Sequence, residues 1–362
     1  MKIFLLFAYA IVLLTGIVIL LSIALVLVNN LTIRREAKIQ EQRKNLRLSL
    51  LSYVKGDIRW PALKIIISGQ EKLLVGLVAQ LAEELGESAR LKCIELFSFK
   101  ELNKLANLEL KKLSHSLNWR KRQRAATFLP YIANSQANIP PLVHALEDKV
   151  FMVRFSAAHS LATIKAIDTI IPILEHLSLP SEWPIERTIE IIYEMGREAI
   201  SPLMNYLSLP TAKNESKVFA ISALGLLHVG EAVPFILTYL CNPDKELRIQ
   251  SAKALGNIGA TEATVALCNS MNDSAWEVKA TSANALGLLK NKSSIPILLG
   301  GLRDSAWWVR YNSANALAEL GNEGITALKE AYSHDDKFAR EVSRLVLQER
   351  SLINSDQERV AS

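Results

Sequence analysis

Apolar residues form one unbroken run near the start of the chain. From Ile3 to Val28 there is no charged residue, and polar side chains are few, among them Thr15 and Ser22. A helix rises about 1.5 Å per residue, so about 20 apolar residues are enough to cross a bilayer. A cleaved signal peptide is the alternative, but its apolar core of about 7–15 residues and its small-x-small cleavage site do not fit this run. The pattern therefore predicts a retained transmembrane helix over residues 1–32.

The basic residues next to this run predict its orientation. Only Lys2 precedes the run, whereas six basic residues follow within about 20 positions; they are Arg34, Arg35, Lys38, Arg43, Lys44 and Arg47. Because Lys and Arg near a span accumulate on the cytoplasmic side, we expect a single-pass protein of the inner (cytoplasmic) membrane with a short N-terminus outside and a cytoplasmic C-terminal domain. Up to Arg124 the chain has 21 basic against 10 acidic residues, and beyond it 21 against 26. This asymmetry favours an anionic lipid surface as a partner over nucleic acid.

After the apolar run the pattern is helical throughout. We expect residues 33–116 to form a basic, membrane-proximal helical region, with amphipathic patterns at 71–85, 88–98 and 100–114. Alternating runs of useful length, which would indicate strands, are lacking, so the chain is predicted to be all-α. The pattern leaves open whether the helices of 53–116 belong to the array that follows.

From about residue 117 one pattern recurs. A basic residue precedes a run of small residues at intervals of 30, 33, 30, 31, 31 and 31; these residues are Arg124, Arg154, Arg187, Lys217, Arg248, Lys279 and Arg310. A polar turn residue stands six positions before most of them, and a second apolar stretch lies upstream of each. A fixed period of this size indicates a solenoid, in which each unit is one helical hairpin that buries its faces only by stacking on its neighbours.

The turns and helix ends of the units carry local signals. In the segment DSAWEV we expect Ser274 to be the N-cap and Glu277, three residues on, to close a capping box. Gly259 and Gly321 are expected to stop their helices. Small residues on one stripe of the second helix should let neighbouring helices approach closely.

The repeated motifs are P-x-L, then D-x-x-x-x-V-R/K, then A-x-A-L-G, as in 242–259 and 273–289. They resemble HEAT repeats of the short, bilin-lyase-like type over residues 117–348, followed by a polar tail, 349–362; the unit at 170–199 departs from the pattern. The resemblance implies a structural ladder between adjacent repeats formed by Asp148, Arg154, Arg248, Asp273, Lys279, Asp304 and Arg310. The whole layout is similar to bacterial membrane-anchored HEAT-repeat proteins, so the expected fold is a transmembrane helix followed by an α-solenoid of HEAT-like hairpins.

Motifs that carry chemistry are scarce. The sequence has no phosphate-binding glycine loop, no HExxH and no nucleophile elbow. Six histidines are scattered over different units, the three cysteines fall in apolar helical patterns as small buried residues, and Glu186, Glu190 and Glu194 are expected to line a solvated helix face. We therefore predict no catalytic, cofactor-binding or metal-binding residue, no cofactor and no small-molecule substrate.

Aromatic residues near the end of the array are the best candidates for partner binding. Trp276 and Trp307 occupy the same position in successive repeats, and Trp308 follows directly. The second helices should line a concave surface, where Trp and Tyr are favoured at interface centres. The candidate residues are Trp276, Glu277, Asn284, Trp307, Trp308, Tyr311, Asn312 and Asn315. Packing of these tryptophans into the core between repeats is the alternative.

These patterns together favour a non-catalytic, membrane-tethered scaffold or adaptor that binds protein partners, themselves membrane-associated, and serves a membrane enzyme complex. Two alternatives stay open. The resemblance to bilin-lyase repeats implies a lyase or chaperone-type factor acting on a protein-bound chromophore. The basic stretch Arg120, Lys121, Arg122 and Arg124 would suit nucleic acid, a partner that the membrane-proximal position disfavours.

Overall fold

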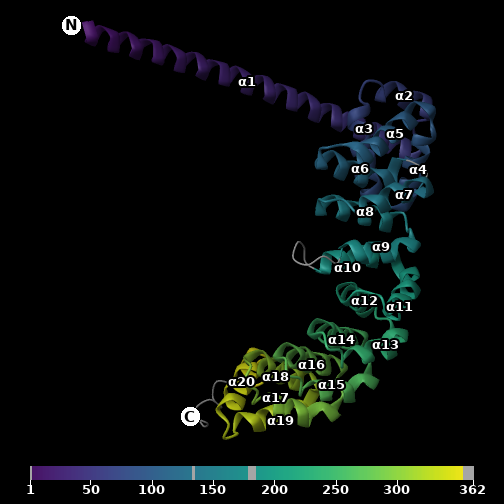
Figure 1. Ribbon diagram of the computed structural model, residues 1–362, viewed down its shortest axis with the longest axis vertical. Helices are drawn as coiled ribbons and strands as arrows, with labels where there is room; N and C mark the ends of the chain where they lie inside the picture. Colours follow the sequence, from purple (N-terminus) through teal and green to yellow (C-terminus); the bar gives the residue numbers. More distant parts are fainter. Residues whose placement is uncertain (1, 133–134, 178–184, 354–362) are drawn as a thin grey trace. The chain divides into compact units, whose positions relative to one another are not determined.

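In the computed structural model, residues 2–132, 135–177 and 185–353 are described (Figure 1), although the side chains of 2–15, 17–19, 72, 101, 135, 185 and 186 are not. Every regular element in these ranges is an α-helix or a short 3₁₀ turn, which confirms the all-α class. The chain divides into two compact units, Met1–Lys112 with Phe128–Ala137 and Leu113–Thr127 with Asn138–Ser362. Each unit is considered by itself.

The apolar N-terminal run lies in the long helix α1 (Lys2–Lys55). Most of the predicted anchor, residues 1–32, falls outside the described side chains. Across the described residues, no helix combines the length and the apolar character that a membrane span needs. The prediction of a transmembrane anchor, and with it the inner-membrane location, is therefore wrong.

The six basic residues after the run lie further along α1. Five of them are exposed, whereas Arg47 is half-buried and donates from Nη2 to Glu84 Oε2 on α3 over 2.6 Å. This hydrogen bond is the largest cause that lowers the pKa of the Glu84 carboxyl. One of the six thus helps to hold α1 against its own unit, and without a membrane span the anionic lipid surface predicted for all six loses its basis.

The first unit packs the C-terminal part of α1 against short helices, which are α2 (Trp60–Ile67), α3 (Glu71–Leu85), α4 (Glu87–Ser98) and α5 (Lys100–His115). Leu46 and Leu50 of α1 are buried with Leu63 and Leu74 of the helices that follow. The rings of Trp60 and Phe99 stack at 4.2 Å and 4°. The basic region predicted for 33–116 therefore contains a packed core of its own.

The second unit consists of stacked helical hairpins in two layers, with the boundary between units falling within α6 and α7. The second helices of the hairpins are α6 (Trp119–Ile132), α8 (Phe151–Thr163), α10 (Ile185–Met195), α12 (Asn214–Leu226), α14 (Lys245–Ile258), α16 (Trp276–Leu289), α18 (Trp307–Glu319) and α20 (Lys337–Glu349). The first helices are α7 (Ser135–Ala145), α9 (Ile170–Leu177), α11 (Ile200–Leu207), α13 (Val233–Tyr239), α15 (Thr264–Ser270), α17 (Ile295–Gly301) and α19 (Gly321–Tyr332). The predicted solenoid of hairpins is confirmed.

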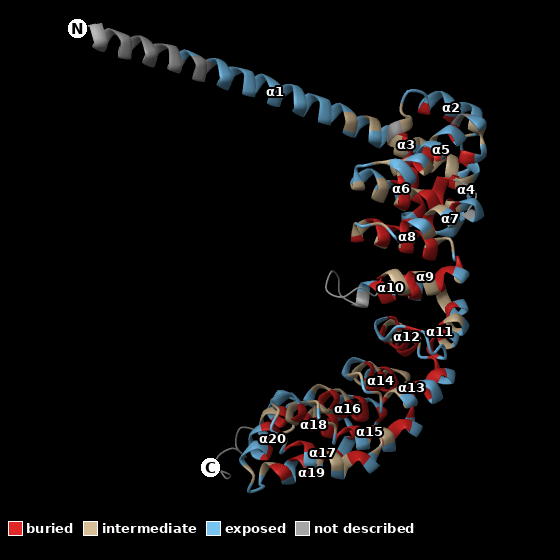
Figure 2. Ribbon diagram, in the orientation of Figure 1, coloured by how far each residue is buried: buried red, intermediate tan, exposed pale blue. Residues whose placement is uncertain are grey.

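Small residues set the spacing of the second-helix layer. A Cβ atom added at Gly225 would lie 2.8 Å from Ala254 Cα, and one added at Gly256 would lie 2.9 Å from Ala285 Cα. Gly287 makes the same approach to Ala316, at 2.9 Å. We call these three contacts the Gly/Ala seam. Figure 2 shows that buried residues gather where these helices meet. The expected close approach of the helices is therefore present.

The turns before α16 and α18 are each closed by an aspartate. Asp273 Oδ1 accepts from the backbone N–H of Ala275 over 2.8 Å, and Asp304 Oδ1 accepts from Ala306 over 2.8 Å. The predicted capping box is wrong: α16 begins at Trp276, after an extended Ala275, and Glu277 binds a neighbouring repeat instead. The expected stop of α14 at Gly259 is confirmed, since this residue adopts the left-handed conformation with φ +77°.

Candidate partner-binding surface

Ion pairs between neighbouring repeats position the starts of the second helices. Arg248 on α14 forms a bidentate pair with Asp273, with Nε to Oδ2 at 2.8 Å and Nη2 to Oδ1 at 3.0 Å. Lys279 on α16 makes a single contact of the same kind, in which its Nζ donates to Oδ2 of Asp304, the turn residue of α18. Each aspartate thus closes its own turn and holds the helix of the preceding repeat. The structure brings these four predicted ladder residues together.

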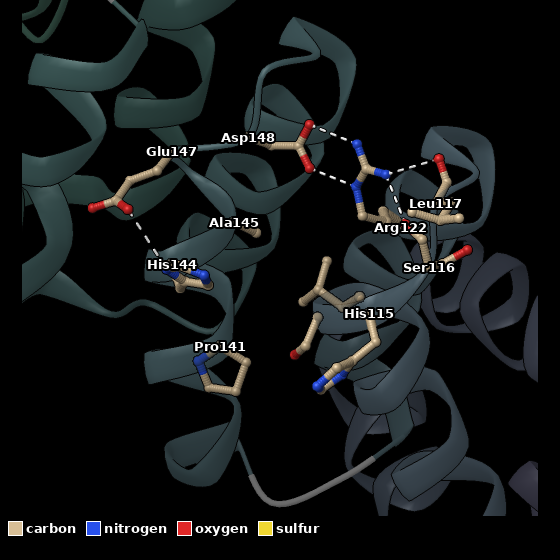
Figure 3. A pocket seen from close by; sticks show the side chains of 11 residues that line it. His115, Ser116, Leu117, Arg122, Pro141, His144, Ala145, Glu147 and Asp148 are labelled. Carbon is tan, nitrogen blue, oxygen red and sulfur yellow. Dashed lines mark hydrogen bonds and ion pairs between the residues drawn. The ribbon is translucent and has the colours of Figure 1, made fainter.

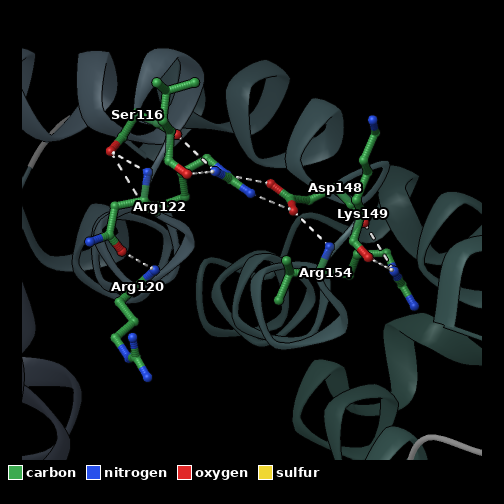
Figure 4. Close-up of polar contacts among 9 residues, drawn as sticks. Ser116, Arg120, Arg122, Asp148, Lys149 and Arg154 are labelled. Atoms are coloured by element: carbon green, nitrogen blue, oxygen red, sulfur yellow. Dashed lines mark hydrogen bonds and ion pairs between the residues drawn. The ribbon is translucent and has the colours of Figure 1, made fainter.

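The ladder in the first repeats differs from the predicted one (Figure 4). Asp148 pairs with Arg122, with Nε to Oδ2 at 2.6 Å and Nη2 to Oδ1 at 2.9 Å. Arg124, which the spacing of the repeats selects, lies two residues further along the helix. Arg154 donates to the backbone carbonyl of Asp148 over 3.0 Å within its own turn, as Arg248 does to the carbonyl of Asn242, and the turn of the following repeat lies outside the described residues. The first repeat is therefore in a different register from the one expected.

The electrostatics of the ladder carboxylates reflect their burial and their donors. Burial alone would raise the pKa values of Asp148, Asp273 and Asp304, but each pKa is lowered. Each carboxylate accepts a hydrogen bond from a basic side chain, which is Arg122, Arg248 and Lys279 respectively, and another from a backbone N–H. Together these hydrogen bonds outweigh the effect of burial on the pKa. The ladder thus prefers its charged form, and its role is to stabilise the array.

Exposed aromatic rings lie at the starts of the last three second helices. Trp276 is 43% exposed, Trp307 45%, Trp308 52% and Phe338 45%. They belong to the first turns of α16, α18 and α20, directly after the aspartate-closed turns or their equivalent. We call these four residues the aromatic edge. Because about half of each side chain is accessible, these residues are not buried in the core between repeats.

The rings on α18 support one another. Trp307 stacks on Tyr311 with centroids 4.8 Å apart and planes 12° apart, while Trp308 meets Trp307 edge-on at 4.7 Å and 80°. Tyr311 Oη donates to Glu349 Oε2 of α20 over 3.1 Å. This hydrogen bond fixes the Tyr311 ring, on which Trp307 stacks. Offset and T-shaped aromatic pairs are favourable by about 0.5–1.5 kcal/mol each. The cluster is therefore held in place before any partner arrives.

Several predicted contact residues are engaged within the chain. Asn312 Nδ2 donates to the Ala280 carbonyl over 2.8 Å, and Asn315 Oδ1 accepts from Arg350 Nη2 over 3.1 Å. Glu277 Oε1 accepts from Lys245 Nζ over 2.7 Å. Asn284 is exposed. The structure thus groups Trp307, Trp308 and Tyr311 directly, whereas the two asparagines on α18 serve the packing of the array.

Phe338 is the member of the aromatic edge that sequence reasoning missed. It follows His334 by four positions, as Trp308 follows Asp304, so the repeat register contained the signal. The histidine in place of an aspartate obscured it. The guanidinium of Arg310 lies 4.4 Å from the Phe338 ring centroid, a cation–π contact that takes the place of the ladder pair in this last repeat.

Outside this surface, the described residues include a pocket but no cluster of metal-binding side chains. A pocket of about 330 Å³ lies between His115 and His144, closed on one side by the pair of Arg122 and Asp148 (Figure 3). His144 faces Glu147 at 3.6 Å on the open surface. Among the residues the structure describes, no group of three or more His, Cys, Asp or Glu could hold a metal ion. The pocket therefore has the size of a ligand site but no convergent reactive groups.

The remaining candidates are isolated. Cys93 is buried, which raises the pKa of its thiol to about 11, but Cys241 is exposed, so the expectation of three buried cysteines is wrong. The side chain of Glu186 lies outside the described set, while Glu190 and Glu194 pair weakly with Arg187 and His159. The basic stretch predicted for nucleic acid loses Arg122 to the ladder.

A sequence model described as HEAT repeats matches residues 108–192, 200–275 and 264–348, which is more than half of the chain. The chain belongs to the HEAT-repeat family. Its HEAT repeats contain both the ladder and the aromatic edge, and they begin somewhat earlier than the residue 117 expected from the spacing. No curated protein matches the chain.

Solved structures similar to this HEAT-repeat chain share only the architecture. The YibA protein of E. coli is 19% identical, with 71% of this chain and 97% of that chain covered and a TM-score of 0.39. A designed armadillo repeat protein for modular peptide recognition is 20% identical, covering 59% and 99% at a TM-score of 0.34. The complex of CpcE and CpcF of phycocyanin lyase from Nostoc sp. PCC7120 is 19% identical, covering 70% and 91% at a TM-score of 0.31. At these scores the likenesses carry no argument about function, and neither a bacterial origin nor a membrane anchor gains support from them.

Proposed function

We propose that this HEAT-repeat protein is a non-catalytic interaction scaffold that binds a protein partner through the aromatic edge and the residues around it. The single observation that carries the proposal is the half-exposed cluster of Trp307 and Trp308, held in place by Tyr311. Repeat arrays present extended surfaces to partners, and a few aromatic anchors commonly supply most of the binding free energy. The membrane attachment expected from the sequence has no part in this proposal.

The surrounding contacts support an interaction surface. Tyr311 is tied to the terminal helix α20 through Glu349, so the rings lose little freedom when a partner covers them. Large aromatic side chains supply apolar area together with a polar atom.

Crosslinking and purification of the full chain from its native cells tests the proposal. We expect the captured partner to be lost from the Trp308→Ala variant, because the side chain is accessible and central in the cluster. Tyr193→Ala is the matched control, since Tyr193 is an aromatic residue on α10 that is 61% exposed. Capture of the same proteins by both variants, with unchanged thermal unfolding, would show that the aromatic edge is not the binding surface.

A further inference from the structure

The aromatic edge advances by one step per repeat. Trp276 and Trp307 occupy the same position on α16 and α18, and Trp308 and Phe338 occupy the next position on α18 and α20. Packed helices lie about 8–10 Å apart, so the rings follow one another at about that interval. The close seam between Gly287 and Ala316 holds α16 and α18 to this spacing.

This interval matches one backbone conformation of a ligand. A polyproline II helix rises about 3.1 Å per residue with three residues per turn, so equivalent side chains recur about every 9 Å. Alternate side chains of a β-strand recur about every 7 Å, which does not match. Successive turns of an α-helix recur at 5.4 Å, and its own hydrogen bonds leave no free carbonyls along its length.

The polar groups of the edge fit the same ligand. Within the described part of the chain, no hydrogen bond engages the indole N–H groups of Trp276, Trp307 and Trp308, and all three side chains are about half exposed, so each can donate to a ligand. The carbonyls of a polyproline II segment are all free, because this helix has no internal hydrogen bonds. Trp donors and free carbonyls therefore complement each other at the turns that face Trp276 and the Trp307–Trp308 pair, whereas Phe338 offers only its ring.

The charges next to the rings favour an uncharged ligand. Lys245 is paired with Glu277 at 2.7 Å, and Lys279 is paired with Asp304. Arg310 lies over Phe338 and donates to the Asp304 carbonyl over 2.8 Å. Because these charged groups are already matched within the chain, a strongly basic or acidic segment gains no ion pair from them.

We infer that the aromatic edge binds an extended, uncharged proline-rich segment in which proline recurs at every third residue. Successive prolines contact Trp276, the Trp307–Trp308 pair and Phe338 in turn, and the indole N–H groups donate to backbone carbonyls between them. A preformed polyproline II segment loses little conformational entropy on binding. The inference rests on the proposed function, since it specifies the partner of the same surface.

A designed pair of peptides tests the inference. The first is an uncharged peptide of about five Pro-x-x repeats, and the second has the same composition with its prolines grouped at one end. Each carries a fluorescent label and is titrated with the full chain while anisotropy is recorded. We expect the periodic peptide to bind at least about tenfold more tightly than the grouped one, and Trp308→Ala to weaken its binding about tenfold. Trp308→Phe should lose less than Trp308→Ala, because a six-membered aromatic ring remains although the indole N–H and part of the ring area are removed.

The outcomes separate this inference from the proposed function. Equal binding of the two peptides would overturn the periodic register. Failure of both peptides to bind, while Trp308→Ala still loses the captured native partner, would overturn the inference and leave the interaction surface standing. Tyr193→Ala should bind the periodic peptide like the unaltered chain; an equal loss in this control would place binding elsewhere. Circular dichroism melts of each variant show that the fold is retained.

Discussion

The segments 273–287 and 304–318 share ten of fifteen residues, yet they lie in different surroundings. In the first, Glu277 pairs with Lys245 of the preceding repeat and Gly287 packs on Ala316 of the next. In the second, Trp308 replaces the glutamate and is exposed at the aromatic edge. The shared residues build the hairpin, and the differing residues decide how each copy meets its neighbours.

The comparison also separates the interior of the array from its end. Lys279 pairs with Asp304 of the next repeat. Arg310 occupies the position of Lys279 one repeat on, but there the aspartate position holds His334. The guanidinium of Arg310 lies over the Phe338 ring. The ladder therefore ends where the aromatic rings gather. Residues freed from holding a further repeat are available for a partner.

The largest expected effect comes from the seam of the first copy. Gly287→Val places a branched side chain where a Cβ atom alone would lie 2.9 Å from Ala316 Cα, so α16 and α18 must separate. We expect the free energy of unfolding to fall by about 1–3 kcal/mol, the usual cost of overpacking. Gly300→Ala is the control, because no atom lies within 4 Å of its added Cβ. Urea unfolding followed by circular dichroism measures both, and an equal midpoint for the two variants would contradict the seam.

The next effect distinguishes the two ladder positions. Asp304→Ala removes the partner of Lys279 and the acceptor of the Ala306 N–H, and leaves a half-buried ammonium unpaired. We expect a loss of about 1–3 kcal/mol. His334→Ala, at the equivalent position one repeat later, removes only an exposed acceptor for the Asp336 N–H, at 2.9 Å, and should lose less. The reverse order in urea midpoints would show that the ladder does not stabilise the array.

A smaller effect depends on pH. The pKa values of Asp273 and Asp304 are lowered in the folded chain, because hydrogen bonds from Arg248 and Lys279 outweigh burial. Their contribution to stability is therefore complete above the unfolded pKa of about 4 and is lost as the pH falls through the lower folded value. We expect the urea midpoint to fall below about pH 4 and to fall less steeply in Asp304→Asn. An identical acid profile for that variant would contradict the assignment.

The smallest effect on stability comes from making the copies more alike. Glu277→Trp places a second ring beside Trp276, as Trp308 stands beside Trp307, and breaks only the exposed pair with Lys245. We expect no measurable change in the thermal midpoint, since exposed ion pairs contribute little. The periodic proline peptide should bind this variant more tightly, and anisotropy titration measures the difference. Weaker binding would show that Glu277 itself contacts the ligand.

The repeat period and the small-residue stripe were sufficient to predict the hairpins and their close packing. The capping box failed because Asp273 lies within reach of the same backbone N–H groups as Ser274, and because Glu277 finds Lys245, 32 residues earlier in sequence. Such a non-local competitor is not visible in a local motif. In the first repeat the basic residue that marks the period is Arg124, whereas Arg122, two positions earlier, pairs with Asp148, so the spacing alone did not identify Arg122 as a ladder residue.

The sequence was sufficient to predict the tryptophans of the candidate site but not the contacts of the polar residues around them. Position within the repeat identified Trp276, Trp307 and Trp308, but the roles of Asn312 and Asn315 depend on the Ala280 carbonyl and on Arg350, which only the packed array brings close. The apolar N-terminal run has the composition of a span, yet the described part of α1 falls short of one.

The Gly/Ala seam has a consequence for how such a chain can change in length. The surface that α14 offers to α16 at Gly256 and Ala285 is the same as the one that α16 offers to α18 at Gly287 and Ala316. A gene duplication that copies one unit of about 31 residues between them would therefore create only contacts that already exist in the protein. The tandem gene segment can gain or lose a unit without a new interface, while α18 and α20 keep their part of the aromatic edge.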